Sequence, residues 1–212
     1  NVAIGFDAGT NVSSGVQNTI IGGLAGDALT TGSYNVAIGK GALSAEDTGS
    51  RNVAIGSRAL NVLNYDGDGY NIAIGYDAGL NMSTGVYNTI VGGLAGDALT
   101  EGTTNILLGY GAGGALTTGS DNVAIGTYAL DAEDEHGRNV AVGHEALGTL
   151  NAGAHGYNTA VGYYAGREMT TGVQNTILGA QAGDALTTGD HNVAIGFRAL
   201  SDEDTGNNSI AV

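Results

Sequence analysis

Apolar triplets recur along the whole chain at an almost constant spacing. Each triplet follows an asparagine and ends at a glycine, as in the run Asn-Val-Ala-Ile-Gly that begins at Asn35. Ten of the twelve units have 17 residues and two have 19, and they begin at Asn1, Asn18, Asn35, Asn52, Asn71, Asn88, Asn105, Asn122, Asn139, Asn158, Asn175 and Asn192. A short period that covers a whole chain is typical of a solenoid, in which each repeat is one turn of a coil.

Each recurring residue has a physical role in such a coil, whose positions we number from the asparagine. The β-branched triplet at positions 2 to 4 predicts a three-residue strand, and twelve strands stacked at about 4.8 Å form a parallel sheet about 58 Å long. Glycine at position 5 predicts a tight corner, and alanine at position 8 suits a narrow part of the coil. Asparagine at position 1 tolerates a left-handed backbone and predicts a hydrogen-bonded ladder along the stack.

The charged residues support this register. Like charges are never at equal positions of neighbouring coils, although the chain has 21 acidic and six basic residues. Such a distribution is expected where equal positions lie directly over one another. Opposite charges do meet at equal positions, and they predict three ion pairs: Arg58 with Asp77, Asp121 with Arg138, and Arg167 with Asp184.

The pattern predicts one all-β domain over residues 1–212, a parallel β-solenoid or β-roll of twelve coils of 17 to 19 residues. The repeat shows no linker or composition shift, and a thirteenth unit starts at Ser209. We therefore expect the chain to be part of a longer protein.

Most triplets are apolar at all three positions, whereas a strand with one wet face should alternate. If positions 2 and 4 face the interior, position 3 forms an outward apolar stripe that another chain would cover, and this favours a homotrimer. The stripe would consist of Ala3, Ile20, Ala37, Ala54, Ala73, Ile90, Leu107, Ala124, Ala141, Ala160, Ile177 and Ala194.

Composition narrows the function classes. The formal net charge of −15 disfavours binding to nucleic acids and anionic membranes. The 39 glycines occur without proline, which excludes collagen, and 42% hydrophobic residues exclude plain disorder. No apolar run is long enough to insert into a membrane.

The strand-and-corner motif, as in the run from Asn122 to Gly126, resembles the head repeats of trimeric autotransporter adhesins. It is also similar to the NTAIG-type repeats of bacteriophage tail fibres. The resemblance covers the whole chain, although these coils are longer than the adhesin repeat. It implies a left-handed parallel β-roll in a trimer, located outside the cell, on the cell surface or on a virion.

The sequence contains no recognisable set of catalytic residues, so we expect that the protein is not an enzyme and has no cofactor. The four histidines (His136, His144, His155 and His191) lie at different coil positions, which does not suggest a zinc site. Calcium is the alternative to consider, because carboxylates lie in two adjacent coils. Its candidate ligands are Asp66 and Asp68 in the first 19-residue coil, and Glu46 and Asp47 in the coil before it.

Tyrosines concentrate near the coil boundaries, where an exposed ring could stack on a sugar. The candidate glycan contacts are Tyr34, Tyr70, Tyr87, Tyr157, Tyr163 and Tyr164. Adjacent threonine pairs such as Thr30-Thr31 also raise an ice-binding surface as an alternative. That function needs a regular threonine array on one strand face, and these threonines fall in turns.

These observations predict a structural or adhesive fibre segment that attaches a bacterial cell or a phage to a surface. Its partners would be copies of itself and a surface receptor, including a glycan. One alternative is a self-assembling extracellular filament subunit, and another is a solenoid that binds ice or calcium.

Overall fold

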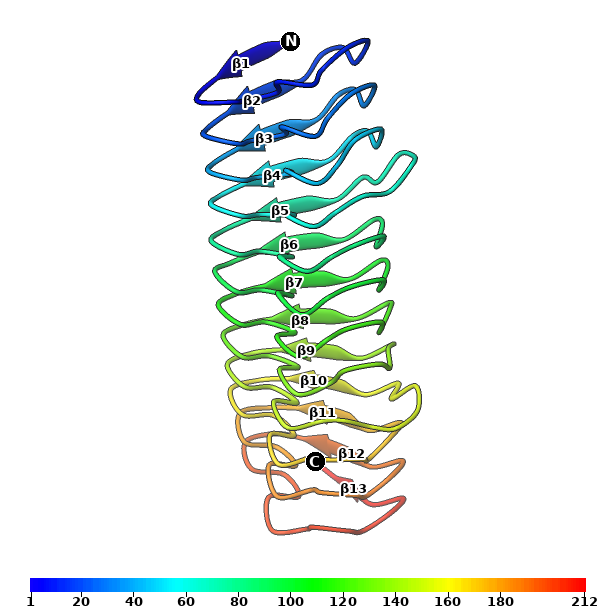
Figure 1. The fold of residues 1–212 in the computed structure, drawn as a ribbon. Helices are drawn as coiled ribbons and strands as arrows, with labels where there is room; N and C mark the ends of the chain where they lie inside the picture. The colour runs from blue at the N-terminus through cyan, green and yellow to red at the C-terminus, as the bar shows by residue number, and fades with distance from the viewer.

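The computed structural model covers residues 1–212 and confirms the all-β parallel solenoid, without any helix (Figure 1). Every strand pairs only with the next one in the sequence, so the sheet order is the chain order. The strands are β1 (Val2–Ile4), β2 (Thr19–Ile21), β3 (Val36–Ile38), β4 (Val53–Ile55), β5 (Ile72–Ile74), β6 (Thr89–Val91), β7 (Ile106–Leu108), β8 (Val123–Ile125), β9 (Val140–Val142), β10 (Thr159–Val161), β11 (Thr176–Leu178), β12 (Val193–Ile195) and β13 (Ile210–Ala211).

The register is the one that the repeat predicts, because each residue pairs with the residue at the same position of the next coil. Ala37 of β3 pairs with Ala54 of β4, for example. The two 19-residue coils keep this strand register, and their extra residues form longer loops near β5 and β10 (Figure 1).

The corner after each strand requires glycine. The position-5 glycines have φ between +121° and +145°, a conformation that other residues adopt only with strain. Space is also absent, since a Cβ on Gly22 would lie 2.5 Å from the carbonyl oxygen of Gly39 in the next coil. The corner is therefore fixed by both conformation and stacking.

The asparagine ladder is confirmed, with more bonds than the sequence suggests. The backbone N–H of Asn35 donates to Oδ1 of Asn18 at 2.8 Å, and Nδ2 of Asn35 donates to the carbonyl oxygen of Gly49 at 2.8 Å. The asparagines of the inner coils are buried. The left-handed residue is not asparagine but the one before it, such as Tyr34 with a φ of 62°. The turn is completed one residue early, which lets the asparagine N–H point to the preceding coil.

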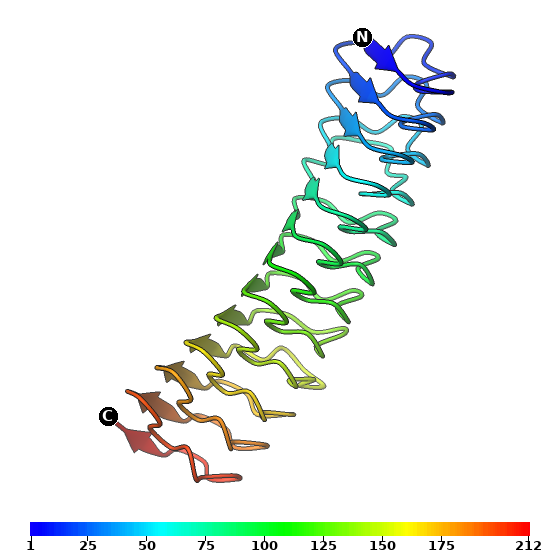
Figure 2. The same cartoon turned by 90° about the vertical axis from the view of Figure 1, so that its left-hand side faces the viewer.

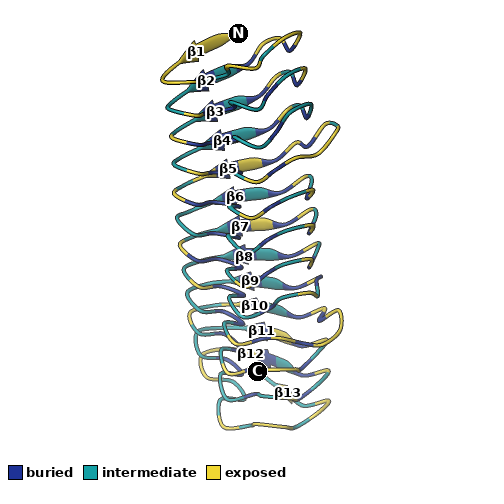
Figure 3. Cartoon of the chain, in the orientation of Figure 1, coloured by how far each residue is buried: buried dark blue, intermediate teal, exposed yellow.

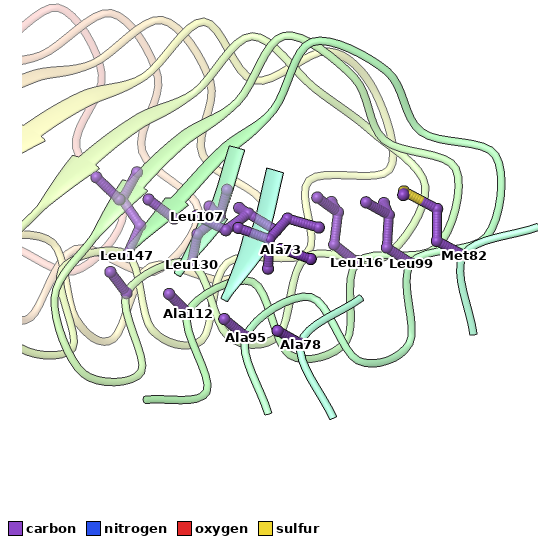
Figure 4. Close-up of a cluster of buried hydrophobic side chains, with 14 of the residues drawn as sticks. Ala73, Ala78, Met82, Ala95, Leu99, Leu107, Ala112, Leu116, Leu130 and Leu147 are labelled. Atoms are coloured by element: carbon purple, nitrogen blue, oxygen red, sulfur yellow. The ribbon is translucent and has the colours of Figure 1, made fainter. Parts of the chain in front are cut away.

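The core is a set of columns that run the length of the rod. Figure 4 shows part of it, with the position-8 column of Ala78, Ala95 and Ala112 and the position-12 column of Met82, Leu99 and Leu116. Figure 3 shows that buried residues recur in every coil, while exposed ones are most frequent in the first and last coils. The stack also bows along its length (Figure 2). No helix in the structure has the length and hydropathy that a membrane span needs.

Candidate functional site

The faces of the strands are the reverse of the sequence-based assignment. Position 3 points into the coil, and its residues from Ile20 to Ala194 are fully buried, whereas Ala3 is exposed in the first coil. The predicted outward stripe at position 3 is therefore wrong. The interior is narrow, so it admits one inward side chain per strand, and this is usually alanine.

Positions 2 and 4 instead point outward, and we call these two columns the sheet face. Its side chains are partly or largely exposed, with values of 39% for Ile72 and 40% for Ile106. Position 2 contributes Val2, Thr19, Val36, Val53, Ile72, Thr89, Ile106, Val123, Val140, Thr159, Thr176 and Val193. Position 4 contributes Ile4, Ile21, Ile38, Ile55, Ile74, Val91, Leu108, Ile125, Val142, Val161, Leu178 and Ile195.

Three of the tyrosines proposed as glycan contacts form one exposed ladder with an arginine. The guanidinium of Arg51 lies 5.2 Å from the ring centre of Tyr34 and 5.6 Å from that of Tyr70. Tyr70 in turn stacks on Tyr87 with ring centres 5.7 Å apart. All of these residues occupy the last position of their coils, so the sequence identified the column correctly. Tyr157 ends a later coil, where its ring lies 5.5 Å from the guanidinium of Arg138.

Tyr163 and Tyr164 lie at a different corner, just past the position-5 glycine. Their ring centres are 3.9 Å apart, and the ring of His144 lies 5.5 Å from that of Tyr163. The structure adds Tyr110 and Tyr128 to this corner, with ring centres 5.5 Å apart. The sequence missed that pair because Tyr110 is at position 6 and Tyr128 at position 7 of the next coil.

The four calcium candidates do not converge. Glu46 turns into the core at position 12, where its oxygens accept hydrogen bonds from the backbone N–H groups of Gly49 (2.7 Å) and Tyr65 (3.2 Å). Asp68 forms an ion pair with Arg51. Asp47 and Asp66 line one shallow hollow, where Asp66 accepts a hydrogen bond from Thr48 at 2.7 Å. Two carboxylates at one hollow are fewer than the six to eight oxygens that calcium prefers.

The buried glutamates have perturbed acidity. Burial raises the pKa of Glu46, and the backbone N–H donors from Gly49 and Tyr65 offset part of that effect. Burial likewise raises the pKa of Glu133, which occupies the same core position in a later coil. Both pKa values are raised because the core solvates a charge poorly.

Two histidines lie closer together than their coil positions suggest. The rings of His136 and His155 are 6.4 Å apart, because the two extra residues of the second 19-residue coil shift His155 into line with His136. Glu133, Asp134 and His136 place ligand atoms within 4.8 Å of one another. Nδ1 of His136 lies 3.6 Å from Oε1 of Glu133, beyond hydrogen-bond distance.

Two of the three predicted ion pairs are present. Nε of Arg58 donates to Asp77 at 2.8 Å, and Arg138 lies 3.8 Å from Asp121. Arg167 instead donates to its neighbour Glu168 at 2.7 Å and not to Asp184, because its guanidinium lies over the ring of Tyr164.

Comparison of the chain with family models, with curated proteins and with solved structures finds no match.

Proposed function

We propose that the chain is a structural and adhesive fibre segment in which three copies pack through their sheet faces, outside the cell or on a virion. The observation that carries this proposal is the sheet face, which is largely apolar and continuous along the rod. A soluble monomer rarely exposes an apolar patch of more than a few hundred Å². Here two columns of branched side chains run past twelve consecutive coils.

The size of this face fits an interface between copies. A sheet about 58 Å long and roughly 10 Å wide offers roughly 600 Å² per chain, near the lower bound for a specific contact. Side chains that flank the face would add to this area. The partner best matched to such a face is a second rod of the same length and pitch, because its columns would repeat at the same spacing.

Attachment to a surface would then use the parts of the rod that lie outside the interface between copies. The Tyr34–Tyr87 ladder and the Tyr163 corner lie in the turns before and after the strands and not on the strands themselves. They would repeat three times around the fibre, and weak contacts to a surface would gain from that multiplicity. The acidic surface is consistent with a receptor that is not a nucleic acid.

The ice-binding alternative has less support. The first threonine of each pair bonds to the next coil, as Thr30 does to the carbonyl oxygen of Asp47 at 3.0 Å. The second threonine points elsewhere, so the pairs do not form a two-column array. The sheet face carries threonine in only four coils (Thr19, Thr89, Thr159 and Thr176), and the bowed stack does not present a flat plane (Figure 2).

Light scattering after size-exclusion chromatography tests the proposal. We expect a particle of three times the chain mass of 21.0 kDa. Ile125→Glu, in the middle of the sheet face, should reduce it to a monomer. Thr31→Glu is the matched control, because its column already carries Glu101 in another coil. A monomeric wild-type chain would refute the assembly, and fibres of variable length would favour the filament alternative.

A further inference from the structure

Two hollows lie side by side at the corner past the position-5 glycines, on coils six to ten. One has a volume of about 390 Å³ and is lined by Tyr128, Asp131, Glu145, Gly148, Thr149, Arg167 and Glu168. The other has a volume of about 400 Å³, and its lining includes Tyr110, Asp97, Gly111, Gly114 and again Tyr128 and Asp131. Because they share Tyr128 and Asp131, the hollows form one groove along the rod axis.

Two glycines make room for side chains that form the walls of this groove. A Cβ on Gly111 would lie 2.8 Å from the ring of Tyr128, and a Cβ on Gly114 would lie 2.5 Å from Oδ1 of Asp131. Other coils carry larger residues at these two positions, such as Leu94 at position 7 and Leu80 at position 10. The groove therefore depends on this particular order of coils and is not a property of the repeat itself.

The walls combine ring faces with fixed polar groups. Tyr110 and Tyr128 are 48% and 38% exposed, so a ligand can reach their rings. Asp131 is half-buried at the junction of the two hollows. At the far end, Arg167 is held 4.5 Å from the ring centre of Tyr164, and both its Nε and its Nη2 contact Oε1 of Glu168.

We propose that this groove binds a neutral oligosaccharide that lies along the rod axis. Sugar rings present C–H faces that pack on tyrosine, and their hydroxyl groups donate to carboxylates and accept from arginine. Four carboxylates (Asp97, Asp131, Glu145 and Glu168) against one arginine would repel an anionic sugar or a phosphate. The same carboxylates disfavour a purely apolar ligand, because it would leave them without polar partners. The proposal gives the adhesive role its ligand class and, in that respect, rests on the proposed function.

Calorimetry and ligand-observed NMR with cellohexaose, maltohexaose and chitohexaose test the groove. At least one of these neutral sugars should bind, and Tyr128→Leu should weaken its binding about tenfold, the equivalent of about 1.4 kcal/mol. Leucine already occurs at this position in Leu24 and Leu94, with positive φ, so the fold should tolerate it. Asp131→Ser should have an effect of similar size, since the column contains Ser44.

Tyr76→Ser is the matched control, because Tyr76 is an exposed tyrosine that lines neither hollow and Ser57 occupies the same position of the preceding coil, and it should leave sugar binding unchanged. The proposal is overturned if none of the three sugars binds at millimolar concentration, if Tyr128→Leu binds as the wild type does, or if spermine binds more tightly than any of them. Light scattering of the same samples separates the two proposals. A trimer that binds no sugar refutes the groove alone, and a monomer that binds sugar refutes the assembly alone.

Discussion

Ile20 fills the space beside Gly26 in the second coil. A Cβ on Gly26 would have its three nearest neighbours all in the side chain of Ile20, with Cδ1 at 3.5 Å. The same compensation recurs in nine of the twelve coils, where a large residue at position 3 faces glycine at position 9 or alanine at position 3 faces leucine. Ala37 with Leu43 and Ala54 with Leu60 are examples of the second kind. In the other three coils alanine faces glycine, and side chains of the neighbouring coils approach instead, as Leu60 and Ile90 do beside Gly79.

This compensation predicts that a larger residue at position 9 restores the stability lost when the residue at position 3 is made smaller. Ile20→Ala should destabilise the protein by about 2–4 kcal/mol, because it opens a cavity in the core. The double variant Ile20→Ala/Gly26→Leu should recover much of that loss, since leucine at position 9 already adopts positive φ, as in Leu43 with 54°. Urea unfolding of both single variants and the double variant measures the coupling. Additive losses in the double variant would show that the two positions do not share a space.

The volume pattern also explains which features the sequence could predict. The period and the register were readable, because asparagine and glycine recur and because charges such as Arg58 and Asp77 match. Which side chains of the strand point into the coil could not be predicted, since Val36, Ala37 and Ile38 are all apolar and provide no alternation. The exchange of volume between positions 3 and 9 was the signal that could have placed position 3 inside.

Other misses come from contacts between different positions of neighbouring coils. Tyr110 and Tyr128 meet although their coil positions differ by one, and His136 meets His155 because of a two-residue insertion. A sequence comparison that matches only equal positions of neighbouring coils does not detect such pairs. The groove could therefore not be predicted from the sequence, whereas the column of Tyr34, Tyr70 and Tyr87 was predicted.

The asparagine ladder should be a major contributor to stability. Asn105 accepts from the N–H of Asn122 at 3.0 Å and donates to the carbonyl oxygen of Gly119 at 2.9 Å. Asn105→Ala leaves both of these groups without a partner in the core, which should cost about 2–5 kcal/mol. Asn11→Ala, at an exposed asparagine, should cost much less. Similar urea midpoints for the two variants would mean that the ladder is not important to stability.

Glu46 should make stability depend on pH in a defined direction. Burial raises its pKa above the ordinary 4.5, so the folded state binds the proton more tightly than the unfolded chain does. Its contribution to stability is then fully present at pH below 4.5 and is lost as the pH rises through the raised value. Glu46→Gln should match the wild type at low pH and become progressively more stable than it at higher pH.

Thermal unfolding across the pH range measures this difference. The exposed Glu101→Gln serves as the control. An equal gain at Glu101, or a gain at Glu46 that does not change with pH, would contradict burial as the cause.

Calcium should leave the stability of the rod unchanged. Glu46 is inside the core and Asp68 is paired with Arg51, so only Asp47 and Asp66 remain at the candidate site. We expect the same melting temperature in millimolar calcium as in a chelator, since ligand binding would raise it by mass action. A calcium-dependent increase in the melting temperature that Asp66→Asn abolishes would support the calcium hypothesis.

Disulfide trapping tests the packing of sheet faces most directly, because the chain has no cysteine of its own. A disulfide forms only where two Cβ atoms approach to about 4 Å. Ile125→Cys, in the middle of the sheet face, should give on mild oxidation a covalent species of twice the 21.0 kDa chain mass. Thr31→Cys should remain a single chain under the same conditions. A single-chain band for Ile125→Cys, or equal cross-linking at both positions, would contradict the proposed assembly.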